Sequence, residues 1–166
     1  MNITIDINGK DVSAAIEPRV TLLDFVRDVA GLKGNHAGCE HGVCGACTIL
    51  LDGEAVRSCL ILAAQAEGSQ ITTIEAVDGT ARQPGELSVI QDAFCEAHGL
   101  QCGYCTPGMV LAAKTLLQHN PTPSREQVRE AISGNMCRCT GYVQIIDAIM
   151  LAAERLQGRN QPADGA

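Results

Sequence analysis

Eight of the nine cysteines fall into two groups of four, and this grouping constrains the fold more than any other feature of the sequence. The first group is Cys39, Cys44, Cys47 and Cys59, with the spacing C-x4-C-x2-C-x11-C. The second group is Cys102, Cys105, Cys137 and Cys139, a C-x2-C pair separated by 31 residues from a C-x-C pair. Cysteines at such spacings serve as disulfides, metal ligands or catalytic groups, so the fold is expected to bring each group together.

The start of the chain bears on which of these uses applies. Residues 1–6 have neither the basic start nor the apolar run of a signal peptide, so we expect a cytoplasmic protein. In that reducing compartment grouped cysteines more often bind metal or act in catalysis than form disulfides. We therefore expect metal ligands and not a disulfide framework.

The first group favours a [2Fe-2S] cluster. Its first three cysteines have the spacing of plant-type ferredoxins. Each iron of such a cluster is bridged by two sulfides and needs two thiolates, so four cysteines complete it. Gly38, Gly42 and Gly45 allow the backbone to approach the sulfurs and to point N–H groups at them. A structural zinc site is the alternative, although its paired ligands usually have shorter intervals.

The second group is less specific by itself. A C-x-C pair is unusual in zinc ribbons, yet the spacing alone leaves zinc open. Each pair comes directly before an expected helix start, at Thr106-Pro107 and at Thr140-Gly141. Two positive helix ends with free N–H groups would then face one site, which favours an anionic cofactor.

Composition and charge limit the partners and the core. The chain has no Trp, two Tyr and two Phe, so its core must be aliphatic. Each half is near the size at which such a core becomes marginal, so we expect cofactor binding to contribute to folding. A net charge of -7 without a run of Lys or Arg argues against nucleic acid or an anionic membrane as partner. No stretch approaches the about 20 apolar residues that a membrane span needs.

The first half has the pattern of a small α+β domain. Apolar residues alternate over residues 3–16 on either side of an Asn8-Gly9 turn, which predicts a β-hairpin. A helix capped by Thr21 is expected to end at Gly31, with Val29 on its apolar face. Further strands are expected at residues 48–51, through Val56, and at residues 71–74.

The second half has the pattern of a helical domain. Residues 77–86 are rich in Gly, Pro and polar residues and read as a linker. Four helices are expected beyond it: one carrying Leu87 and Phe94, one capped by Thr106 with Pro107 at its first helical position, one capped by Ser124, and one from about Tyr142. The residues after Gly158 are expected to be a disordered tail. The predicted domains are therefore 1–76 and 87–158, with a linker at 77–86 and a tail at 159–166.

Three motifs closely resemble the iron-sulfur subunit of the molybdenum hydroxylases, the xanthine dehydrogenase and aldehyde oxidoreductase family. They are GCEHGVCGACT at residues 38–48, QCGYCTPG at residues 101–108 and GNMCRCTGY at residues 134–142. The resemblance covers nearly the whole chain, from the hairpin to about Leu156, and the third motif is especially specific. One departure is the Glu40-His41 pair, where many relatives carry Gly directly after the first cysteine.

The resemblance implies a fold, a cofactor set and partners. The fold is a β-grasp plant-type ferredoxin domain followed by an all-α four-helix domain, each holding one [2Fe-2S] cluster on its own cysteine group. The partners are a large molybdopterin subunit and a medium FAD subunit, in a hetero-oligomer for which a dimer of heterotrimers is the candidate assembly. Electrons would pass from molybdenum to the helical-domain cluster, then to the ferredoxin-domain cluster and on to flavin. Residues matching Gln101 and Cys139 lie beside the pterin in the family.

Three functional classes follow from these features. The favoured one is the electron-transfer subunit of a molybdenum hydroxylase, and the alternatives are a free-standing two-cluster carrier and a zinc-stabilised interaction module. No Ser-His-Asp set, phosphate-binding loop or dinucleotide motif stands out, so no substrate-converting residue is expected in this chain.

Residues outside the two groups have simpler interpretations. Cys95 is expected to be a buried free thiol, and His36, His98 and His119 are expected at the surface. Arg138 either offsets the charge of a cofactor or is a solvated loop residue.

Overall fold

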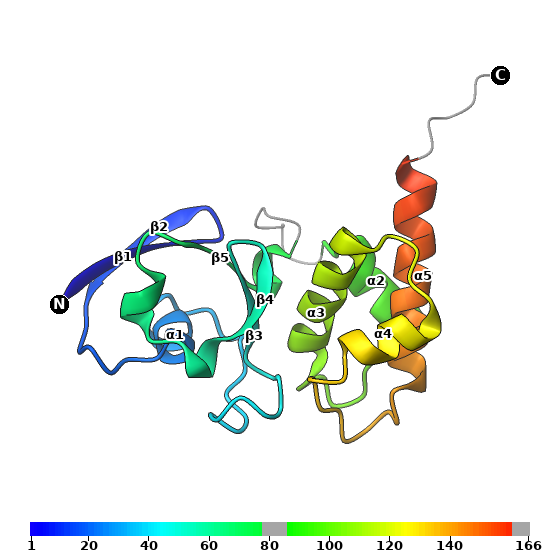
Figure 1. Ribbon diagram of the computed structural model, residues 1–166, viewed down its shortest axis with the longest axis horizontal. Coiled ribbons are helices and arrows are strands. Elements are labelled where there is room, and N and C mark those ends of the chain that lie inside the picture. Colours follow the sequence, from blue (N-terminus) through cyan, green and yellow to red (C-terminus); the bar gives the residue numbers. More distant parts are fainter. Residues whose placement is uncertain (78–85, 161–166) are drawn as a thin grey trace.

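The computed structural model describes residues 1–77 and 86–160, which form two lobes side by side (Figure 1). The N-terminal lobe is built on a five-stranded sheet and the C-terminal lobe on four helices. The expected fold class, α+β with a ferredoxin-like domain followed by a helical domain, is confirmed.

The sheet has the strand order β2-β1-β5-β3-β4. Its strands are β1 (Asn2–Ile7), β2 (Lys10–Ala15), β3 (Thr48–Leu51), β4 (Glu54–Arg57) and β5 (Gln70–Thr72). Only β1 and β5 pair in parallel; the other neighbours are antiparallel. Asn8 and Gly9 have φ of 56° and 76°, as a type I′ turn requires, which confirms the expected hairpin.

The strand expected at residues 71–74 is shorter than predicted. β5 ends at Thr72, because the backbone N–H of Thr73 donates to the side-chain Oδ1 of Asn8 (2.9 Å) and not to a neighbouring strand. Ile74–Ala76 then forms a 3-10 turn (η4). Two further 3-10 turns, η2 (Ser58–Leu60) and η3 (Ala63–Ala66), connect β4 to β5.

The helix expected after Thr21 forms in two parts. Thr21 caps it as predicted, accepting the N–H of Asp24 at 3.1 Å, and the α-helical turn α1 (Leu22–Asp24) leads into the π-helical turn η1 (Phe25–Val29). A π turn holds one more residue than an α turn and therefore rotates the residues that follow. Val29 consequently leaves the apolar face and is 43% exposed, contrary to the expectation.

Four helices make up the second lobe. They are α2 (Val89–Glu96), α3 (Thr106–His119), α4 (Arg125–Ala131) and α5 (Val143–Asn160). Ser124 caps α4 through a capping box with Gln127, as predicted. α2 has the same device in Ser88 and Gln91, so it begins after Leu87, which lies outside the helix and is 46% exposed.

Two further expectations in this lobe are wrong. The residue that caps α3 is Cys105, whose carbonyl accepts the N–H of Met109 at 3.0 Å, and Thr106 is already helical. Cys95 is exposed and not buried, because α2 turns the neighbouring Phe94 toward the core, and a residue one position further points about 100° away from it.

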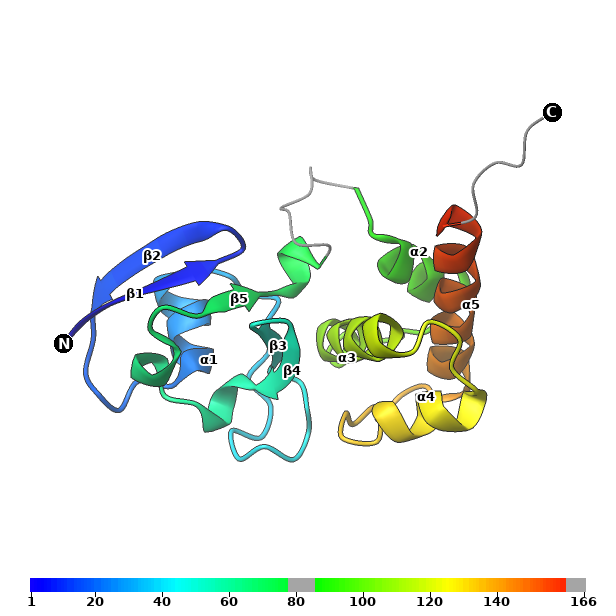
Figure 2. The same cartoon turned by 45° about the horizontal axis from the view of Figure 1, so that its top comes forward.

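The two lobes share a packed boundary. α3 lies between the sheet and the other helices (Figure 2), and Leu50 of β3 is buried within the apolar core of the helical lobe. Val77, the first residue of the predicted linker, is also buried in that core, whereas residues 78–85 lie outside the described residues. α5 extends to Asn160, and the rest of the predicted tail lies outside the described part of the chain. No described helix is both long and apolar enough to cross a membrane.

Candidate metal centres

The first cysteine group lies in the loop between η1 and β3 and in the turn η2. Its thiols occur in two pairs. The thiols of Cys39 and Cys44 interact with each other, and the backbone N–H of Cys44 also donates to Sγ of Cys39 at 3.4 Å. Cys47 packs with Cys59 in a small buried cluster. The fold therefore brings the four predicted residues of this group together as one solvent-accessible and one buried pair.

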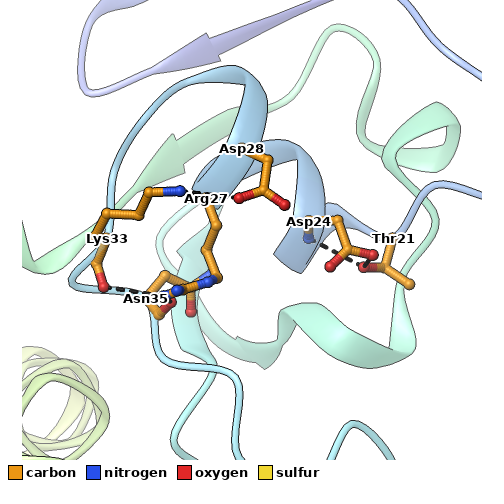
Figure 3. A network of polar contacts seen from close by, with 6 residues as sticks. All are labelled: Thr21, Asp24, Arg27, Asp28, Lys33 and Asn35. Atoms are coloured by element: carbon orange, nitrogen blue, oxygen red, sulfur yellow. Dashed lines mark hydrogen bonds and ion pairs between the residues drawn. The ribbon is translucent and has the colours of Figure 1, made fainter.

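A polar network anchors the start of this loop to the helix (Figure 3). The guanidinium of Arg27 donates to the carbonyl oxygens of Lys33 (3.1 Å) and Asn35 (2.6 Å). The side chain of Asn35 in turn donates to Ser58 Oγ (3.1 Å), and Ser58 Oγ donates to the carbonyl oxygen of Cys47 (2.8 Å). Because Ser58 precedes Cys59, these bonds hold the two members of the buried pair close to each other.

The second cysteine group forms a comparable set at the surface of the helical lobe. Sγ of Cys139 lies 3.5 Å from Sγ of Cys102, and the thiols of Cys105 and Cys137 interact with each other. All four residues line one cavity of about 180 Å³. The loop that carries Cys137 is fixed by Tyr142, whose hydroxyl accepts the N–H of Cys137 at 2.9 Å.

The thiols differ in electrostatic environment. Hydrogen bonds from the backbone N–H groups of Cys44 and His41 lower the pKa of the Cys39 thiol to about 6. Burial raises the pKa of Cys59 to about 11 and that of Cys105 to about 12. Backbone N–H groups that stabilise a thiolate would equally stabilise an anionic cluster bound to it.

The paired thiols fit a [2Fe-2S] cluster at each group. Each iron of such a cluster takes two thiolates, so two pairs are the donor set it needs. Among residues 1–77 and 86–160, no three His, Cys, Asp or Glu side chains converge as ligands of a single metal ion.

The loops that carry the two cysteine groups are in contact across the lobe boundary. The backbone N–H of Met136 donates to the carbonyl oxygen of Cys44 at 2.8 Å. Met136 directly precedes Cys137, so one hydrogen bond and a short stretch of backbone connect a member of each group.

Other predicted residues take varied positions. Gln101, Cys102 and Cys139 are exposed on one edge of the helical lobe. Arg138 is also exposed and, within the part of the chain that the structure describes, has no hydrogen-bond or ion-pair partner.

His36 was expected at the surface, but it is partly buried. Its ring stacks on Tyr104 at 4.7 Å between centroids, and its Nδ1 donates to the Tyr104 carbonyl oxygen at 2.7 Å. Tyr104 lies between Cys102 and Cys105, so this pair is a second bridge between the lobes. His98 and His119 are exposed, as expected, although Nε2 of His119 lies 3.3 Å from Oε1 of Glu54.

Sequence reasoning missed three polar residues beside the cysteine loops. They are Thr48, Arg57 and Asn135. A buried asparagine inside the motif at residues 134–142 was a possible signal, because a polar side chain next to a cysteine needs partners. Nothing in the sequence around Arg57 indicated its role.

Comparison with known proteins agrees with this geometry. Residues 5–75 match a family model described as "2Fe-2S iron-sulfur cluster binding domain", and residues 73–150 match one described as "[2Fe-2S] binding domain". The nicotine 6-hydroxylase small subunit of Paenarthrobacter nicotinovorans is 48% identical over 96% of this chain and 94% of its own. The caffeine dehydrogenase subunit gamma of Pseudomonas sp. (strain CBB1) is 52% identical over 89% of this chain and 87% of its own.

Solved structures show the same similarity. A chain of quinoline 2-oxidoreductase from Pseudomonas putida 86 superimposes with a TM-score of 0.88 at 51% identity, over 98% of both chains. Aldehyde oxidoreductase from Desulfovibrio gigas gives a TM-score of 0.88 at 41% identity, over 99% of this chain but 19% of that one. The whole of this chain therefore corresponds to one part of a longer polypeptide in the second case.

Proposed function

Because the chain belongs to the small iron-sulfur subunits of the molybdenum hydroxylases, the xanthine dehydrogenase and aldehyde oxidoreductase family, we propose that it carries electrons from a molybdopterin subunit to a flavin subunit. The chain is an electron-transfer subunit of an oxidoreductase complex, with two [2Fe-2S] clusters of its own. In this proposal partner subunits hold molybdopterin and FAD. Family membership decides between iron-sulfur and zinc in favour of iron-sulfur.

The ligands that we propose follow the pairs in the structure. In the ferredoxin-like lobe, Cys39 and Cys44 would hold one iron, and Cys47 and Cys59 the other. In the helical lobe the pairs would be Cys102 with Cys139 and Cys105 with Cys137. Each cluster, when bound, takes up and releases one electron.

One observation carries this proposal: the hydrogen bond from the Met136 N–H to the Cys44 carbonyl oxygen. It brings the two cysteine loops into contact across the lobe boundary. A chain with two adjacent one-electron sites is suited to conduct electrons between partners.

The exposed cysteines of each lobe mark two separate surfaces at which partner subunits can bind. Gln101, Cys102 and Cys139 reach the surface of the helical lobe, where we place the molybdopterin subunit. The loop of Cys39 and Cys44 reaches the surface of the other lobe beside the exposed Val43, where we place the flavin subunit. A cytoplasmic location and a dimer of heterotrimers stay predictions.

The test is the cofactor content and activity of the purified protein. The complex should yield about four irons and about four acid-labile sulfides per copy of this chain, and the chain alone should oxidise no substrate. Cys95→Ser is the matched control, because Cys95 is an exposed thiol outside both groups and its loss should leave the iron content unchanged. Stoichiometric zinc with little sulfide, or turnover by the chain alone, would contradict the proposal.

A further inference from the structure

A buried polar cluster joins the two lobes beside the cysteine loops. It consists of Thr48 on β3, Arg57 on β4 and Asn135 in the loop before Cys137, and we call it the interlobe lock. Thr48 is 1% exposed and Asn135 is 3% exposed. None of the three is a predicted cluster ligand.

Asn135 reaches from the helical lobe into the ferredoxin-like lobe. Its Nδ2 donates to the carbonyl oxygen of Gly45 (3.0 Å) and to Oγ1 of Thr48 (3.2 Å). Its Oδ1 accepts a longer bond from Arg57 Nη2 (3.3 Å). A buried amide whose nitrogen and oxygen both have hydrogen-bond partners has one favoured orientation. These bonds therefore fix the loop of Cys137 relative to the loop of Cys44.

Arg57 and Thr48 complete the cluster from the other side. Arg57 donates from Nη1 to Thr48 Oγ1 (2.8 Å) and from Nη2 to the carbonyl oxygen of Gly134 (2.6 Å). The hydroxyl of Thr48 donates to the carbonyl oxygen of Gly45 (2.6 Å). Thr48 is therefore the shared centre of the lock, because its single hydroxyl bonds to three partners.

The lock lies directly beside the contact between the cysteine groups. Gly45 follows Cys44, and Asn135 precedes Met136, whose N–H donates to the Cys44 carbonyl oxygen. Apolar packing alone would allow these two loops to slide, whereas directional hydrogen bonds on both sides of the contact restrict them to one register.

Resting on the electron-transfer function proposed above, we propose that Thr48, Arg57 and Asn135 are positioning residues that fix the separation of the two clusters and thus the rate of electron transfer between them. They act through the cysteine loops, because their hydrogen bonds join them to one another and to the carbonyl oxygens of Gly45 and Gly134. Removing hydrogen bonds from the interlobe lock should leave both clusters bound but weaken the magnetic coupling between them.

The experiment compares two substitutions at Thr48 in the purified complex. Thr48→Val has nearly the same shape but no hydroxyl, and Thr48→Ser keeps the hydroxyl. After full chemical reduction, the paramagnetic signals of two nearby clusters split each other, and this splitting falls steeply with distance. We expect Thr48→Val to retain about four irons per chain, while the splitting of its paramagnetic signals narrows or is lost. Thr48→Ser should retain the wild-type splitting.

Asn135→Asp provides a second variant, because it removes the Nδ2 donor at constant side-chain size. Its matched control is Asn120→Asp, an identical change at the end of α3, away from both cysteine groups. The first should narrow the splitting and the second should not. Wild-type splitting in both Thr48→Val and Asn135→Asp at full iron content would overturn the proposal.

Amide exchange at Met136 gives a readout that does not need the clusters. The bond to the Cys44 carbonyl protects this N–H, so its hydrogen exchange should be faster in Thr48→Val than in Thr48→Ser. If Thr48→Val loses iron, its splitting cannot be measured. In that case, equal rates of hydrogen exchange at the Met136 N–H in Thr48→Val and Thr48→Ser would overturn the proposal. Failure of the proposed function is distinguishable, because it would appear in the wild type as missing iron and sulfide.

Discussion

At the scale of single residues, Cys39 and Cys59 belong to one proposed site but lie in opposite environments. Cys39 accepts backbone N–H groups in an accessible loop, and Cys59 is buried against Leu23 and Cys47. The first environment favours the thiolate and the second favours the neutral thiol. Cluster assembly on this group should therefore begin at Cys39, which is the better nucleophile and metal ligand at neutral pH.

This difference is testable in the cluster-free chain. The pKa of Cys39 is lowered from 9.0 to about 6, so its thiolate predominates at neutral pH and is lost as the pH falls through about 6. The pKa of Cys59 is raised to about 11, so this thiol stays protonated at neutral pH. We expect iodoacetamide to label Cys39 much faster than Cys59, as measured by peptide mass spectrometry. Equal labelling of the two at neutral pH would contradict the assigned environments.

At the scale of elements, helix α3 depends on close approach to the sheet at its first turn. Gly108 lies against the loop of the first cysteine group, and a Cβ atom added to it would lie 2.4 Å from the carbonyl oxygen of Gly45. The obstacle is backbone and not the end of a flexible side chain, so only a shift of the helix or the loop could relieve it. The start of α3 therefore sets the spacing between the two lobes.

Gly108→Ala should accordingly destabilise the protein. Overpacking of this kind costs about 1–3 kcal/mol, and for a chain of this length each kcal/mol corresponds to about 2–4 °C in Tm. Gly158→Ala in α5 is the matched control, because nothing lies within 4 Å of its added Cβ, and removing a helical glycine stabilises by up to about 1 kcal/mol. Thermal unfolding followed by circular dichroism measures both. Equal Tm values for the two variants would show that α3 can move away from the sheet without cost.

At the scale of the whole molecule, the two lobes place the cysteine groups in series. Each group reaches the surface through its own loop, and the two loops meet at the contact between Met136 and Cys44. An electron entering at the exposed edge of the helical lobe can therefore leave at the far lobe without crossing solvent. Removing either group should interrupt a different step.

Replacing one ligand from each group tests that order. In the purified complex, Cys139→Ser should remove or alter one of two distinct paramagnetic signals and stop electrons at the molybdenum centre. Cys59→Ser should spare that first step, so that in a single turnover substrate still reduces the helical-lobe cluster while transfer to flavin stalls. Stopped-flow spectroscopy and freeze-quenched paramagnetic resonance measure the two steps. The reverse pattern, with Cys59→Ser blocking reduction of the helical-lobe cluster, would reverse the proposed direction.

Much of this molecule could be predicted from local sequence. The alternation around the Asn8-Gly9 turn and the capping box at Ser124 involve residues close in the chain, so both appear in the structure as expected. The eight cysteines stood out for the same reason, since metal ligands require particular residue types at short spacings. Local errors arose where a distant residue intervened, as when the Asn8 side chain took the N–H of Thr73 and ended β5.

The sequence by itself thus determined the fold class, the kind of cofactor and the family. Only the tertiary structure decided which thiols pair, which thiol is accessible, and how the two lobes meet. The interlobe lock joins Thr48 and Arg57 to Asn135, which is 78 positions beyond Arg57. Its hydrogen bonds depend on burial and orientation that no short-range pattern encodes, so the contact that joins the two cysteine groups becomes visible only when both lobes are folded against each other.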